Sequence, residues 1–179
     1  GSRGARHRQD ARLAPRTTAT MDAARRRRLI DQYTDACRLV AEALAGATDA
    51  ELDARPVPGA WSAREIVHHL ADSEMTGAVR LRLLVTGPNA TILAYDQDAF
   101  AQRLHYERPI EASLEAFNAA RRSTAEILER LSEAEWQRAG IHTERGRLTV
   151  EGWLEIYAAH GHKHAGQIRA ARASARASQ

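Results

Sequence analysis

Four long stretches of the sequence repeat their apolar residues at the spacing of an α-helix, and this repetition constrains the fold more than any other feature. The stretches cover about residues 22–45, 62–85, 111–131 and 149–175. Each would present an apolar stripe along one side of a helix. Such helices become stable when their stripes pack against one another, so the sequence predicts an all-α fold, a four-helix bundle.

The connections between these helices differ in length. Residues 47–60 are rich in proline and glycine and predict a loop, and residues 140–148 predict another. The link over residues 87–110 is far longer than the roughly 2–8 residues that usually join neighbouring helices in bundles, so a long crossover connection is expected there. Ser62–Glu65 and Ser132–Glu135 each have the form of a capping box and predict helix starts.

The length of 179 residues suits one domain, predicted here over residues 21–175. The single Cys37 excludes a disulfide within the chain and any cysteine-based metal motif. No apolar run approaches the ~18–20 residues of a membrane span, and no signal peptide is recognisable. We therefore expect a bacterial-type cytoplasmic protein without a membrane partner.

The positive charge of the chain is concentrated at one end. Residues 1–20 contain five arginines and one acidic residue, whereas the whole chain carries a formal net charge of +3. The predicted domain is therefore nearly neutral, which disfavours nucleic acid as a partner. Residues 1–20 lack helical periodicity and begin Gly-Ser, so we expect a disordered basic leader or a cloning remnant.

Histidines are the most informative polar residues in the predicted helices. At about 100° per residue, His69 falls on the inner stripe of the second helix, and His160 and His164 fall together on that of the last helix. The same geometry places His68 on a charged outer face and turns His162 toward solvent. Three inward histidines from two helices are thus separated from their neighbours by periodicity alone.

A histidine on the inner face of a helix can be either a hydrogen-bonded core residue or a metal ligand. A lone one is usually a hydrogen-bonded core residue, but two stacked at i and i+4 both need buried partners, which a bundle rarely supplies. Metal-binding bundles place ligands in this way, on facing helices. His69, His160 and His164 would give a three-nitrogen site for a divalent ion with an open position, zinc first, with nickel, iron or manganese as alternatives.

Carboxylates near these histidines are candidates for supporting contacts. Metal-bound histidine usually donates its second ring N–H to a carboxylate or a carbonyl. Glu65, Asp72 and Glu74 are close to His69 in sequence and could accept it, or could lie on a solvated face. The choice is open at this stage.

The long link carries the candidate catalytic residues Tyr95, Asp96 and Asp98. Long loops over a rigid scaffold often hold functional residues. These side chains could reach over the mouth of the bundle, or Asp96 could only cap a short helix. No general base is assigned.

At this point two segments resemble a known family. Residues 58–74, with Trp-Ser leading to Glu, His-Leu and Asp, and residues 157–168, with His-x-x-x-His before Gln-Ile, are similar to signatures of the DinB/YfiT-like metalloenzyme family. Residues 95–98 also resemble a segment of the YfiT-like branch, and the likeness spans about residues 25–172. The chain departs from that branch at Ala159, and at Lys163, which separates two histidines.

The resemblance implies a four-helix bundle with one long crossover and a divalent metal ion bound by the positions of His69, His160 and His164. It also implies a metal-dependent hydrolase or a thiol S-transferase acting on a small-molecule substrate. For a transferase the partner would be a low-molecular-weight thiol such as bacillithiol or mycothiol. A non-catalytic, stress-type metal-binding bundle is the alternative, and assembly as a homodimer is left open.

Overall fold

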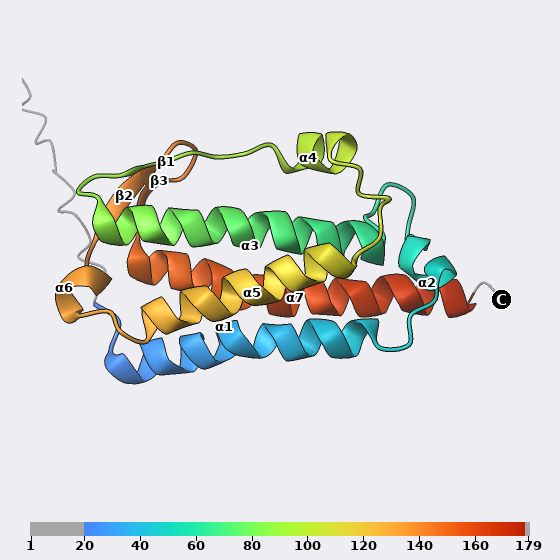
Figure 1. Ribbon diagram of the computed structural model, residues 1–179, viewed down its shortest axis with the longest axis horizontal. Coiled ribbons are helices and arrows are strands. Elements are labelled where there is room, and N and C mark those ends of the chain that lie inside the picture. Colours follow the sequence, from blue (N-terminus) through green and yellow to red (C-terminus); the bar gives the residue numbers. More distant parts are fainter. Residues whose placement is uncertain (1–19, 178–179) are drawn as a thin grey trace, which may run out of the picture.

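The computed structural model describes residues 20–177 and confirms the predicted four-helix bundle (Figure 1). The bundle consists of α1 (Ala23–Leu44), α3 (Ala63–Thr86), α5 (Glu111–Leu128) and α7 (Val150–Ala177). The expectation for the basic leader falls on residues 1–20, nearly all of which lie outside the described part. Each predicted long helix is therefore present close to its expected bounds.

The order of the helices in the bundle depends on the long link. Helix α2 (Asp49–Asp53) joins α1 to an antiparallel α3. The link then carries β1 (Thr91–Ile92) and α4 (Gln97–Arg103) back along the outside of α3, so that α3 and α5 run in the same direction (Figure 1). After α5, the short α6 (Glu133–Trp136) and a hairpin lead into α7. The predicted crossover connection is confirmed.

One predicted loop is wrong. Residues 140–148 were expected to be irregular, but they form most of a hairpin of β2 (Ala139–His142) and β3 (Gly146–Thr149). β2 pairs antiparallel with β3 and parallel with β1, giving the order β1-β2-β3. Strands of two to four residues carry too short an alternation to be recognised, and the parallel pairing depends on the distant link. The sheet attaches the crossover to one end of the bundle.

Helix starts follow the local sequence. The capping boxes of Ser62 with Glu65 and of Ser132 with Glu135 are both formed, as predicted. A third, Thr48 with Glu51, opens α2. In each, the hydroxyl and the carboxylate accept backbone N–H groups that the first turn leaves unpaired. The box at Ser62 fixes the start of α3, seven residues before His69.

The core contains two apolar clusters and a buried ion pair that touches both. Arg121 of α5 donates to Oε2 of Glu74 on α3 through Nε and Nη2, at 2.9 and 2.7 Å, and neither side chain is exposed. The guanidinium lies 4.1 Å from the ring centre of Tyr33 in one cluster and 4.9 Å from that of Phe117 in the other. It also donates to the Tyr157 carbonyl at 3.1 Å, so it connects α3 and α5 to α7.

Gly161 of α7 gives a stability prediction. A Cβ at this position would lie 2.5 Å from Cβ of Ala36 on α1, too close for packed carbon atoms. Gly161→Ala is therefore expected to lower the free energy of unfolding by about 1–3 kcal/mol, measured by urea denaturation. Gly166→Ala is the matched control, because a Cβ there meets nothing within 4 Å and alanine favours helix by up to about 1 kcal/mol. Equal effects at the two sites would contradict this packing.

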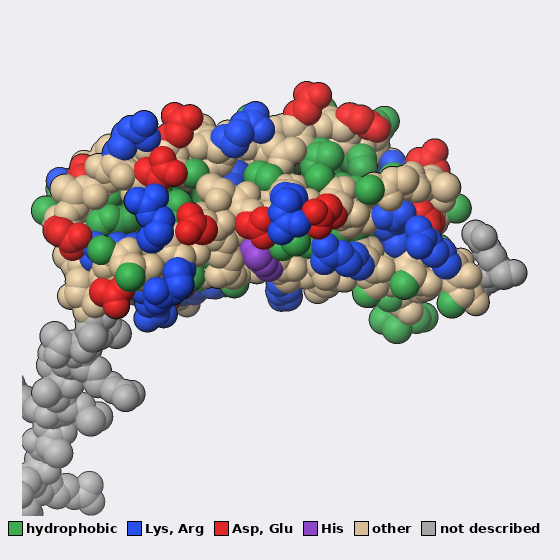
Figure 2. Space-filling view, turned by 90° about the horizontal axis from the view of Figure 1, so that it is seen from below, with side chains coloured by type: hydrophobic (Ala, Val, Ile, Leu, Met, Phe, Trp, Pro, Cys, Tyr) green, Lys and Arg blue, Asp and Glu red, His purple; other side chains and the backbone are tan. Residues whose placement is uncertain are grey.

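The surface of the described part carries charges of both signs. The face in Figure 2 shows lysine and arginine side chains lying among aspartate and glutamate, without one broad patch of either sign. Among residues 20–177, no helix combines the length and the apolar character needed to cross a bilayer. The mixed charge of the face in Figure 2 matches the nearly neutral domain expected from the sequence.

Candidate metal centre and adjoining cavities

Three histidines from α3 and α7 bring their ring nitrogens together. Nε2 of His160 lies 3.2 Å from Nε2 of His69 and 3.1 Å from Nε2 of His164. The potential ligand atoms of all three lie within 4.8 Å of one another. Helix α7 supplies two rings one turn apart, and α3 supplies the third across the helix interface. The structure therefore confirms that the three histidines converge, as helical periodicity predicted.

Burial determines the charge of this cluster. Loss of hydration lowers the pKa of His69 to about 3, of His160 to about 2 and of His164 to about 4, with mutual repulsion adding to the shifts of His69 and His160. All three rings are therefore neutral at pH 7. A neutral ring with its proton on Nδ1 offers the Nε2 lone pair, so the three converging Nε2 atoms can all bind one cation. The donor set thus fits a divalent metal ion.

These pKa values predict how stability depends on pH in chelator-treated protein. Below about pH 6.5 the unfolded histidines bind protons that the folded ones do not, so the free energy of unfolding should fall as the pH is lowered. The slope should reach about 1.4 kcal/mol per pH unit for each histidine. Urea denaturation between pH 7.5 and about 5.5 measures it, because ordinary carboxylates titrate mostly below that range. A flat profile would contradict neutral burial.

The carboxylates proposed as supporting contacts do not serve that purpose. Glu65 accepts the Ser62 N–H in the capping box, Asp72 accepts the Tyr106 hydroxyl at 2.6 Å, and Glu74 pairs with Arg121. Nδ1 of His69 is buried without a hydrogen-bond partner, as is that of His160. The supporting-carboxylate hypothesis is therefore wrong for these residues, because each has a closer structural partner.

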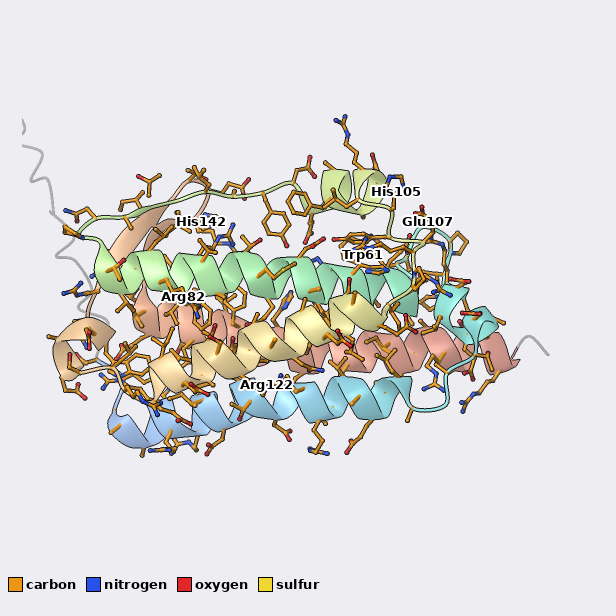
Figure 3. The ribbon with its side chains drawn as sticks, viewed as in Figure 1. Trp61, Arg82, His105, Glu107, Arg122 and His142 are labelled. Carbon is orange, nitrogen blue, oxygen red and sulfur yellow. The ribbon has the colours of Figure 1, made fainter. Side chains whose placement is uncertain are left out.

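Packing orients the rings instead. Trp61 precedes α3 (Figure 3). Its ring lies edge-on to that of His69, with ring centres 4.8 Å apart. The rings of His160 and His164 lie 4.4 Å apart at 77°. Gln167, one turn beyond His164, partly opposes the lowering of its pKa. Aromatic contacts and the helix backbone thus fix the direction of the three Nε2 atoms.

The outward placement of His68 was wrong. His68 is fully buried; its Nε2 lies 2.9 Å from the Arg108 carbonyl and its Nδ1 lies 2.8 Å from Oγ of Ser113. A carbonyl only accepts, so Nε2 carries the proton and donates it, and Nδ1 accepts from the serine. The start of α5 and the segment before it cover this face of α3, which periodicity could not reveal. His68 nevertheless stays outside the cluster.

His162 also differs in detail from its expectation. It is half-buried, and its Nε2 donates to the Gln32 carbonyl of α1 at 2.9 Å, rather than pointing freely to solvent. The reason is that α1 packs along that side of α7. As predicted, its ring stays away from the three converging imidazoles, which makes it a natural control.

Two cavities share His69 and His160 in their walls. The first has a volume of about 510 Å³ and the second about 570 Å³. The long link covers both: Tyr95 and Asp96 line the first cavity, and Asp98 lines the second. Asp96 also caps α4, since its Oδ1 accepts the N–H groups of residues 98 and 99. Both alternatives left open for Asp96, reaching the mouth and capping a helix, therefore hold together.

Several cavity residues were missed from the sequence. The first cavity is also lined by Ser73, Arg80, His142, Arg145 and Tyr157. Ser73 and Arg80 follow His69 by four and eleven residues on one helix face, so periodicity could have found them. His142 and Arg145 belong to the hairpin, whose short strands show no recognisable pattern in the sequence.

Comparison with known proteins agrees with this fold. Residues 32–168 match the sequence model of the DinB superfamily, and the chain belongs to that superfamily. It is 33% identical over 139 residues to "Putative metal-dependent hydrolase OB0782" of Oceanobacillus iheyensis, covering 78% of this chain and 81% of the relative. It is 27% identical over 143 residues to "Putative metal-dependent hydrolase BcerKBAB4_2443" of Bacillus mycoides, covering 80% and 83%.

A solved structure shares the architecture. YfiT from Bacillus subtilis superposes with a TM-score of 0.80 at 24% sequence identity, covering 89% of this chain and 91% of that chain. That protein is described as "a probable metal-dependent hydrolase with an unusual four-helix bundle topology". The likeness supports the four-helix bundle fold of this chain.

Proposed function

We propose that this protein is a metal-dependent hydrolase of small molecules, with a divalent ion bound by Nε2 of His69, His160 and His164. The observation that carries the proposal is the convergence of these three neutral imidazoles in a wall shared by two cavities. When bound, the ion would act as a Lewis acid and activate water for attack. The names of the relatives support metal dependence and hydrolysis.

The number of ligands favours catalysis over a structural role. Structural zinc sites usually have four protein ligands, whereas catalytic sites have three and keep an open position. In the described part of the chain, no further histidine, cysteine or carboxylate belongs to the cluster. Zinc is the first choice for three imidazoles, with nickel, iron and manganese as alternatives.

Other residues of the chain would bind substrate and handle protons. Asp98 is exposed in the wall of the second cavity, and we propose it as the proton acceptor. Asp96 is held at the start of α4 and would position that helix over the site. Burial raises the pKa of Tyr95 and of Tyr157, so both hydroxyls keep their protons at pH 7 and can donate them to a substrate oxygen.

A metal analysis combined with an activity screen tests the function. Full-length protein as purified should contain about one divalent ion per chain and should hydrolyse a member of an ester and amide library. Hydrolysis should stop after chelation and return when the metal is restored. A parallel screen adds a low-molecular-weight thiol and an electrophile. Turnover only with the thiol would replace the hydrolase by a thiol S-transferase, and bound metal without any turnover would favour the non-catalytic bundle.

A further inference from the structure

The wall of the 510 Å³ cavity contains a cation that the proposed metal chemistry does not use. Arg80 lies on α3 three turns after His69, and its side chain lines the cavity. Its guanidinium donates to the Leu93 carbonyl through Nη2 and to the Tyr157 hydroxyl through Nη1, at 3.4 Å for the latter. Its Nε is buried without a hydrogen-bond partner. Both hydrogen-bond acceptors of this cation are therefore neutral.

The buried arginines of the described chain behave differently. Each of them pairs with at least one carboxylate, and they are Arg26, Arg64, Arg121 and Arg172. Pairing offsets the cost of removing a guanidinium charge from water. Half-buried Arg80 lacks such a counter-charge, and it lies where a ligand can enter. An anionic group of a ligand would supply the missing partner through charge-assisted hydrogen bonds.

His142 adds an oriented donor to the same cavity. Its Nδ1 accepts the backbone N–H groups of Glu144 and Arg145, at 3.2 and 3.3 Å. In the neutral ring the proton must then be on Nε2, which can only donate. Figure 3 shows His142 between the hairpin and α3. The ring is buried and lines the same cavity as Arg80, and burial, with a smaller effect of the Arg80 charge, lowers the pKa of His142.

Neither carboxylate in this wall is paired with Arg80. Arg145, at the turn of the hairpin, is a second cation lining the cavity. Of the two carboxylates there, Asp96 is occupied as the cap of α4, and Glu144 is exposed at the turn. The formal charges of the lining therefore balance, but both carboxylates are exposed to solvent and neither forms an ion pair with half-buried Arg80.

We propose that Arg80 and His142 form a subsite for a carboxylate or phosphate group of the substrate. This rests on the proposed function, since it assigns the substrate class of the same site: small molecules that carry an anionic group besides the bond that is cleaved. The subsite adjoins the histidine cluster, because the Arg80 guanidinium reaches the Tyr157 hydroxyl and the ring centre of Tyr157 lies 6.1 Å from that of His160. A cavity of about 510 Å³ accommodates a small molecule of this kind.

Binding of simple anions tests the subsite without knowledge of the substrate. Inorganic phosphate and succinate are titrated separately into the full-length protein by calorimetry, at an ionic strength held constant with chloride. We expect saturable binding of at least one of them, weakened about tenfold or more in Arg80→Met. Binding of phosphate alone would assign a phosphate group, and binding of succinate alone a carboxylate. No binding of either, or unchanged binding in Arg80→Met, would overturn the proposal.

Arg82→Met is the matched control. Arg82 is also a half-buried arginine of α3 with only neutral partners, but it donates to Ser123 and Thr124 of α5 (Figure 3). It does not line the cavity. Binding in Arg82→Met should equal that of the unmodified protein. An equal loss in both variants would mean a general charge effect and would overturn the subsite.

A second variant separates this proposal from the proposed function. In His160→Ala, anion binding should persist even if metal is lost, because Arg80 is not part of the histidine cluster. Loss of anion binding in His160→Ala together with its retention in Arg80→Met would place the anion on the metal and overturn the subsite. Anion binding that depends on Arg80 in a protein that binds no metal would support the subsite and refute the metalloenzyme.

Discussion

Replacing His160 by alanine is expected to remove the metal ion and abolish hydrolysis. Nε2 of His160 lies within 3.2 Å of Nε2 of each of the other two histidines, so its loss leaves two donors in place of three. Loss of a group that only supports a ligand already costs roughly 10–100-fold in metal affinity, and loss of a ligand should cost at least about 100-fold. Elemental analysis of desalted protein should fall from about one ion per chain to background.

His162→Ala is the control for this experiment. His162 is on the same helix and also makes a contact through Nε2, to the Gln32 carbonyl, but it lies outside the cluster. Its replacement should leave metal content and activity unchanged, with a small loss of stability. Circular dichroism should show that both variants stay helical, because the bundle has an apolar core of its own. Full metal content in His160→Ala would contradict the ligand assignment.

Glu74→Gln is expected to cause the largest loss of stability. The change leaves the charge of Arg121 buried without a counter-charge, in a place where neither side chain is exposed. Breaking a buried ion pair in this way typically costs about 3–5 kcal/mol. Urea denaturation should show that loss in the free energy of unfolding. The hydrogen bond from the Tyr33 hydroxyl to Glu74 adds to the effect.

A double variant separates the pair from the packing around it. In Glu74→Leu with Arg121→Met, both charges are removed together, and the double variant should be more stable than either single variant. Arg121 also donates to the carbonyls of Tyr33 and Tyr157, so part of the loss should remain. Strictly additive losses, or a cost below about 1 kcal/mol for Glu74→Gln, would show that the pair does not hold the helices together.

The sequence was sufficient to predict the features that depend on residues close together in the chain. The helical period alone selected His69, His160 and His164, because residues three or four positions apart lie on the same face of a helix. The capping boxes at Ser62 and Ser132 were equally visible, since each is complete within four residues. Features determined by residues within one or two helical turns could be predicted in this way.

Features that depend on distant partners could not. His68 was assigned to the wrong face because the segment that covers it lies about forty residues further along the chain. The ion pair of Glu74 with Arg121 joins residues 47 positions apart, and nothing local marks either member. The hairpin strand containing His142 depends on its pairing with β1 in the long link. Tertiary contacts of this kind bury side chains that the local sequence pattern does not mark as buried.

Anomalous diffraction from crystals of the protein as purified is the most direct test of the central claim. Data collected on both sides of the absorption edge of the metal found by elemental analysis should give one strong difference peak per chain. That peak should lie about 2.0–2.2 Å from Nε2 of His69, His160 and His164. A peak elsewhere, or metal-loaded crystals in which the three imidazoles bind no ion, would contradict the metal centre proposed here.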